Sequence, residues 1–85
     1  MTLEEAVVIA RNLAASENIV LGPVANALHD PTPELALILE QSGIDPKTLD
    51  KWRISFDRVN STIDPATIII SVYTENGKAV FEDNL

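Results

Sequence analysis

The dipeptide Asn76-Gly77 is the feature that most constrains how this chain can fold. It follows residues 67–74, a segment rich in isoleucine and in other residues that suit a pleated sheet. Asn-Gly is a strong hairpin signal, because a type I′ turn needs a positive φ at both of its central positions. The pair therefore predicts an antiparallel β-hairpin with strands at about 67–74 and 78–83, joined by a two-residue loop.

A two-residue loop sets the register of this hairpin and places Tyr73 opposite Val80. Side chains alternate along a strand, so the residues divide between two faces. One face would present Ile68, Ile70, Val72 and Phe81, and the other Ile69, Tyr73 and Val80. Both faces are apolar, and an isolated hairpin is marginal in water. We expect the hairpin to pack on the rest of the chain and to have its second face covered as well.

Two helices are predicted in the first third of the chain. Thr2 and Glu5 form a capping-box pattern, in which each side chain bonds the backbone amide of the other residue, and this predicts a helix over about 3–15. Pro23 suits the first position of a helix, where its missing amide would have no partner. We therefore predict a short second helix over 23–29.

A third helix is predicted over 33–42. Thr32 is a suitable N-cap for it, and the helix should end before Gly43, a residue that readily takes the left-handed conformation of a C-terminal cap.

The next segment, 46–59, fits two structures. Alternation would give a strand with Ile54, Phe56 and Arg58 on one face, whereas helical spacing aligns Leu49, Trp52, Phe56 and Val59. We predict a helix, because it accounts for four large apolar residues instead of two.

The predicted fold is α+β, with four short α-helices followed by a C-terminal antiparallel β-hairpin packed on them. The 85 residues have room for a single small acidic domain, 1–85. A domain of this size buries only about 60 to 65% of the surface that its unfolded chain exposes. Its stability should therefore gain from a partner or from a second copy.

Composition excludes several kinds of site. The chain has no cysteine, so it has no disulfide and no thiolate ligand or nucleophile, and its single histidine is too little for a zinc site. The three glycines are isolated, which excludes the known phosphate-binding loops. Thirteen acidic residues against six basic ones give a net charge of -7, which argues against nucleic-acid and membrane-surface binding. We expect no enzyme activity, no cofactor and no bound metal.

The N-terminal sequence does not match a secretory signal, because Glu4 and Glu5 stand where a basic region would precede an apolar one. No apolar run approaches the roughly 18 residues of a membrane span. A cytoplasmic location is the default expectation.

The middle of the chain carries a family resemblance. Leu21-Gly22-Pro23 is followed by Asp30-Pro31-Thr32-Pro33 and then by the segment from Ile38 to Leu49. This order, within residues 21–49, resembles a single repeat of the N-terminal domain of Clp-type AAA+ unfoldases. The resemblance implies a helical binding module that docks adaptors and substrates. It implies no catalytic role and carries over no contact residue.

These observations favour a small non-catalytic, adaptor-like protein–protein interaction module. The partner-binding residues we expect are Ile69, Tyr73 and Val80, and the partner is another protein or, as a homodimer through the hairpin, a second copy. The alternative function is an acidic inhibitor or immunity-like protein that masks a basic nucleic-acid-binding surface. It is suggested by residues 1–43, which hold six acidic residues against Arg11.

Overall fold

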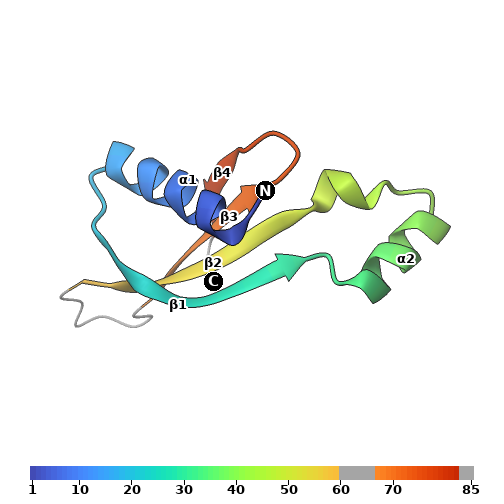
Figure 1. Cartoon of the computed structure of the whole chain (residues 1–85), viewed down its shortest axis with the longest axis horizontal. Helices are drawn as coiled ribbons and strands as arrows, with labels where there is room; N and C mark the ends of the chain where they lie inside the picture. Colours follow the sequence, from blue (N-terminus) through green and yellow to red (C-terminus); the bar gives the residue numbers. More distant parts are fainter. Residues whose placement is uncertain (60–66, 83–85) are drawn as a thin grey trace.

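The protein is described from a computed structural model, over residues 1–59 and 67–82, as one antiparallel sheet with helices on one face and at one end (Figure 1). The strands lie in the order β1-β2-β3-β4, and neighbouring strands are antiparallel. In chain order the elements are α1 (Leu3–Ser16), β1 (Leu21–Asp30), α2 (Pro33–Gln41), the 3-10 helix η1 (Pro46–Leu49), β2 (Lys51–Arg58), β3 (Thr67–Tyr73) and β4 (Ala79–Phe81).

Helix α1 begins where the capping box predicts. The Thr2 hydroxyl accepts a hydrogen bond from the Glu5 amide at 3.2 Å, and the Glu5 carboxylate accepts one from the Thr2 amide at 3.1 Å. The buried residues of α1 are all alanines: Ala6, Ala10 and Ala14. Small side chains on this face let the helix lie close to the sheet.

The core lies between α1 and one face of the sheet. Ile54 and Phe56 of β2 pack there with Ile70 and Val72 of β3, and all four side chains are fully buried. These residues pair across the two strands or stand two positions apart, so they share one face. Among residues 1–59 and 67–82, α1 is the one helix that packs on the sheet, and it covers this face alone.

The segment between β1 and β2, residues 31–50, projects from the end of the sheet, and we call it the arm (Figure 1). It contains α2 and η1. The predicted third helix is confirmed as α2, with Thr32 as N-cap and with Gly43 after its end at a φ of +80°. None of the side chains of α2 is buried.

The predicted second helix over 23–29 is wrong, because this segment belongs to strand β1. Pro23 lies in an edge strand, beside the register shifts between Leu21 and Asn26, where a residue without an amide proton is tolerated. Pairing with β2 along most of its length decides the conformation of a segment whose alanines and leucine also suit a helix.

The predicted fourth helix over 46–59 is wrong as well, because a four-residue 3-10 helix is followed by β2. Two of the four residues that supported the helix, Leu49 and Val59, are exposed. Ile54, which the helix left unused, is fully buried. As a strand, this segment buries every second residue in the core. The alternating pattern, and not the helical spacing, therefore describes it.

The predicted fold class is therefore corrected. The structure is α+β, but the hairpin is half of a four-stranded sheet and is not preceded by four helices. The hairpin itself forms, with a register that differs from the predicted one by two residues: Val80 pairs with Ser71 instead of Tyr73. A shift of two keeps every side chain on its predicted face. The predicted second strand began at 78 and ended at 83; β4 is shorter, and residue 83 lies outside the described residues.

Candidate docking surface on the open face of the sheet

The sheet has a second face, turned away from α1, which we call the open face. It is defined by the strand positions that alternate with the core residues. Its residues are Asn26, Leu28 and Asp30 of β1, Lys51, Arg53, Ser55 and Asp57 of β2, Thr67, Ile69, Ser71 and Tyr73 of β3, Val80 of β4, and Glu82 just after it. Among the described residues, α1 packs on the opposite face, and the arm approaches the open face at one end of the sheet.

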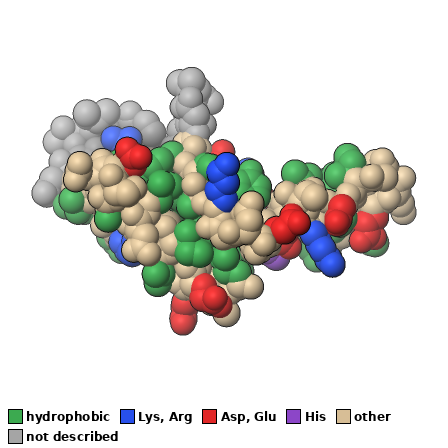
Figure 2. Space-filling model, turned by 90° about the horizontal axis from the view of Figure 1, so that it is seen from above, with side chains coloured by type: hydrophobic (Ala, Val, Ile, Leu, Met, Phe, Trp, Pro, Cys, Tyr) green, Lys and Arg blue, Asp and Glu red, His purple; other side chains and the backbone are tan. Residues whose placement is uncertain are grey.

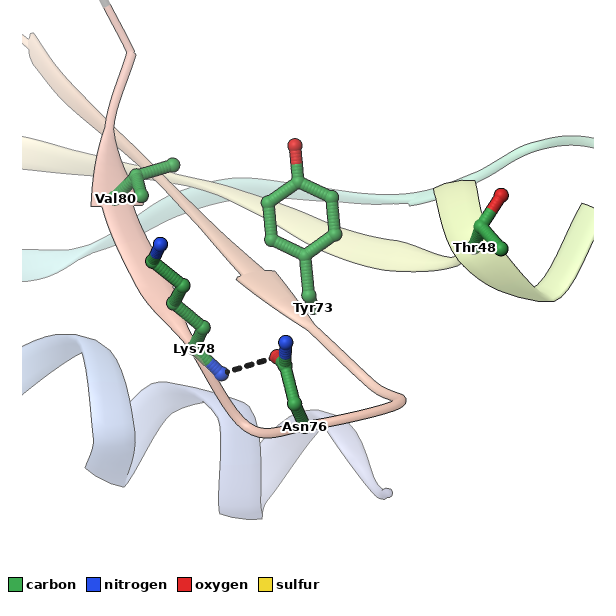
Figure 3. A pocket seen from close by; sticks show the side chains of 5 residues that line it. All are labelled: Thr48, Tyr73, Asn76, Lys78 and Val80. Carbon is green, nitrogen blue, oxygen red and sulfur yellow. Dashed lines mark hydrogen bonds between the residues drawn. The ribbon is translucent and has the colours of Figure 1, made fainter.

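Ile69, Tyr73 and Val80, the partner-binding residues expected from the sequence, all lie on the open face. Each is partly buried, and none belongs to the core beneath α1. Figure 3 shows Tyr73 projecting away from α1, between Val80 and Thr48 of η1. The structure brings the three residues onto one surface, together with Leu28, whose side chain is 51% exposed.

Ion pairs lie among these apolar side chains. Arg53 Nη2 is 3.5 Å from Asp30 Oδ2, and Lys51 Nζ is 3.5 Å from Glu82 Oε1. Ser71 is fully buried, and its hydroxyl donates a hydrogen bond to Glu82. This bond and the nearby Lys51 hold the pKa of Glu82 below its usual value, although partial burial opposes them.

A hollow of about 340 Å³ lies between the arm and the open face, and we call it the arm hollow. Leu35 and Leu39 of α2 and Leu49 of η1 supply its apolar side. Pro31, Asp30, Lys51 and Arg53 complete the lining. Arg53 Nε is buried here and has no hydrogen-bond partner among the residues that the structure describes. The arm hollow therefore combines an apolar wall with an incompletely satisfied guanidinium group.

There is a second hollow of about 370 Å³, which we call the tyrosine hollow. It is lined by Thr48, Tyr73, Asn76, Lys78 and Val80 (Figure 3). The Lys51 Nζ atom is 5.4 Å from the centre of the Tyr73 ring, so a residue that lines the arm hollow makes a cation–π contact with one that lines the tyrosine hollow. Residues of η1 line both of them. The arm and the open face thus form one continuous, uneven surface.

The base of the arm is held by a polar cluster on the α1 side of the sheet. His29 Nε2 lies 2.7 Å from Asp50 Oδ1, and the Thr74 hydroxyl donates to the same oxygen at 2.8 Å. The His29 ring also lies 4.8 Å from the Trp52 ring. Burial raises the pKa of Asp50, but the hydrogen bonds from His29 and Thr74 outweigh it, so this pKa lies below its usual value.

This cluster differs from a triad in which an imidazole activates a hydroxyl nucleophile. In such a triad the hydroxyl bonds the imidazole that takes its proton. Here the Thr74 hydroxyl bonds the carboxylate of Asp50, and the imidazole of His29 bonds that same oxygen. In residues 1–59 and 67–82, no group of three or more His, Cys, Asp or Glu side chains is placed to hold a metal ion. The cluster links β1, the arm and the residue after β3.

The arm is acidic, whereas the open face carries charges of both signs. The arm holds Glu34, Glu40, Asp45 and Asp50 against Lys47, a net of -3. Three of the six cations of the chain, Lys51, Arg53 and Lys78, lie on or beside the open face, against the three carboxylates of Asp30, Asp57 and Glu82. Figure 2 shows the arm as the narrow end of the molecule, with acidic and hydrophobic side chains side by side.

The sequence did not predict the contribution of the arm or of Arg53 to this surface. One signal was available: Leu35, Leu37, Ile38 and Leu39 make α2 apolar on most of its circumference, and a helix of that kind is normally buried. The contact between His29 and Asp50 had no sequence signal, because it depends on the pairing of two strands.

No protein-family model matches the chain, and no curated protein or solved structure matches it either. The resemblance of residues 21–49 to a Clp N-terminal repeat therefore stays a prediction. Neither helix in the described ranges is long and apolar enough to cross a membrane.

Proposed function

We propose that this chain is a small non-catalytic protein–protein interaction module that binds its partner on the open face. The observation that carries the proposal is a sheet face turned away from α1, which presents Ile69, Tyr73 and Val80 beside an arm of exposed leucine and isoleucine side chains. Contiguous exposed apolar patches rimmed by polar residues are typical of interaction sites.

The composition of the open face supports the same proposal. Tyrosine and arginine are enriched in protein interfaces, and Tyr73 and Arg53 each line one of its hollows. The ion pairs of Lys51 and Arg53 are internal to this face, so these side chains are already held in place before a partner arrives. A preorganised surface loses less side-chain entropy on binding.

Site-specific photo-crosslinking in cells tests the proposal. A photoreactive amino acid replaces Val80 on the open face or, as the matched control, Val8 on the outer side of α1, which is 59% exposed. We expect protein adducts from position 80 and few from position 8. Equal labelling from the two positions, or no adduct from position 80, would contradict the proposal.

An acidic inhibitor that masks a basic nucleic-acid-binding surface is the second candidate function. The net charge of -3 on the arm favours it, because Glu34, Glu40 and Asp45 are exposed together at one end of the molecule. The two candidates differ in their response to salt. A complex held by charge weakens steeply as ionic strength rises, whereas one held by apolar contacts on the open face changes little.

A further inference from the structure

We propose that the arm hollow is a binding site for a small amphiphilic anion, an aliphatic monocarboxylate of medium chain length. Its tail lies along α2, and its carboxylate lies against β2. This inference goes beyond the proposed function, because it concerns a small molecule in the arm hollow and not a protein partner. It starts from the two sides of the arm hollow, an apolar wall on the arm and a pair of cations on the sheet.

The apolar wall comes from a helix none of whose side chains is buried. Helix α2 has nine residues, and a helix this short is marginal in water unless an apolar face is packed. Leu35, Ile38 and Leu39 have the spacing of three and four that forms one helix face, and Leu35 and Leu39 line the arm hollow. Leu35 and Ile38 are nevertheless 46% and 57% exposed. The face of α2 that needs packing therefore borders an open space.

The opposite side of the arm hollow is cationic. Lys51 and Arg53 stand two positions apart on β2, so they share the open face and lie about 7 Å apart along the strand. Arg53 Nη2 is 3.5 Å from Asp30 Oδ2. Lys51 Nζ is likewise 3.5 Å from Glu82 Oε1. Both separations exceed the roughly 2.7–2.9 Å of a charge-assisted hydrogen bond, so neither ion pair is a strong one.

Unused hydrogen-bond donors, and not an excess of positive charge, favour an anion here. Asp30 lines the arm hollow with the two cations, and Glu82 beside Lys51 brings the local charge close to zero. The guanidinium group of Arg53 presents its donors as a planar fork that matches a carboxylate. The described chain does not use this fork, because Asp30 lies at 3.5 Å from one nitrogen and the buried Nε has no partner among the described residues.

The two sides together define the class of ligand. An inorganic anion would leave the leucine wall in contact with water, and a hydrocarbon would leave the donors of Arg53 unused. An aliphatic monocarboxylate satisfies both sides with one molecule. The volume of about 340 Å³ lies at the lower end of the roughly 300–1,000 Å³ of small-molecule sites, which favours a chain of medium length over a long one.

Titration of the full chain with hexanoate, followed by amide NMR chemical shifts, tests the inference. We expect saturable changes at α2, at η1 and at residues 51–53 of β2, with a Kd in the millimolar range or below. Acetate has no tail and 1-hexanol has no charge, so each should bind about tenfold more weakly or less. Hexanoate that causes no saturable change at these residues, or that binds no better than 1-hexanol, would overturn the inference.

Matched variants locate the site. Arg53→Gln should raise the Kd for hexanoate about tenfold, whereas Lys78→Gln, which removes the same charge from an exposed position outside the arm hollow, should leave it unchanged. Lys51→Gln is a second variant of the cationic side, should Arg53→Gln fail to fold. Leu39→Asn should weaken binding severalfold, and Leu37→Asn, on the opposite side of α2, should not. Equal effects within either pair would overturn the inference.

Discussion

His29 Nε2 lies 2.7 Å from Asp50 Oδ1, and this contact joins the two ends of the arm. His29 is the next-to-last residue of β1, and Asp50 directly precedes β2. Asp50 also accepts the hydroxyl hydrogen bond of Thr74, and its carbonyl accepts the Thr74 amide at 3.0 Å, which ties the arm to the end of β3. The arm therefore projects from a fixed base, with a set position beside the open face.

Stability should fall with acid partly through Asp50. Its pKa in the folded chain is below the unfolded value of about 3.9, so the unfolded chain binds a proton more readily. The contribution of Asp50 is complete above that value and is lost as the pH falls through the folded pKa. In urea titrations at pH 7, Asp50→Asn should have a lower free energy of unfolding than the native chain. This difference in free energy should shrink below about pH 4.

Thr74→Val is the matched variant for this prediction. It removes one of the hydrogen bonds that lower the pKa of Asp50 and keeps the carboxylate and the His29 contact. Its pH dependence should lie between those of the native chain and Asp50→Asn. The difference in free energy of unfolding between Asp50→Asn and the native chain could instead be the same at pH 3 and pH 7. That result would show that the cluster does not favour the ionised carboxylate.

The capping box should contribute measurably to stability. Thr2→Ala removes the hydroxyl that accepts the Glu5 amide, and loss of such a cap costs about 1 kcal/mol. Thr2→Ser keeps the hydroxyl and should recover most of that loss. Thermal unfolding followed by circular dichroism measures both variants. Equal stability of the alanine and serine variants would mean that α1 gains nothing from the cap and depends on its packing alone.

Local signals with one physical meaning predicted their elements correctly. The cap at Thr2, the cap at Thr32 and the left-handed Gly43 each satisfy or end a helix whatever surrounds it. Signals with two meanings did not. Pro23 is acceptable both at the first position of a helix and in an edge strand, and the choice was made by the pairing of β1 with β2, which sequence patterns do not contain.

The candidate site was predictable in part for the same reason. The alternation of side chains placed Ile69, Tyr73 and Val80 on one face correctly even though the hairpin register was shifted by two residues. That shift has a physical cause, since Asp50 holds Thr74 out of the hairpin ladder and leaves a four-residue loop between Tyr73 and Lys78. The contribution of Arg53 and the arm could not be predicted, because it depends on contacts between segments that are distant in the sequence.

The two faces of β3 should respond differently to the same substitution. Ile70 is fully buried against the core, so Ile70→Val should cost about 0.5 to 1.5 kcal/mol. Its neighbour Ile69 points to the open face and is only partly buried, so Ile69→Val should cost less in the monomer. Urea unfolding at low protein concentration measures both losses. A larger loss at Ile69 than at Ile70 would contradict the assignment of the faces.

The close approach of the β2 backbone leaves no room for a side chain at Gly22 of β1. A Cβ added there would lie 2.6 Å from the carbonyl oxygen of Asp57, so Gly22→Ala must push the two strands apart, at about 1 to 3 kcal/mol. Gly43→Ala is the control, because its Cβ meets nothing within 4 Å and only its φ of +80° is unfavourable, which costs roughly 1 kcal/mol. Changes in amide NMR chemical shift should extend over β1 and β2 in Gly22→Ala and stay near the end of α2 in Gly43→Ala. Shifts confined to the immediate neighbours of Gly22 would mean that the strands accommodate the methyl group without moving.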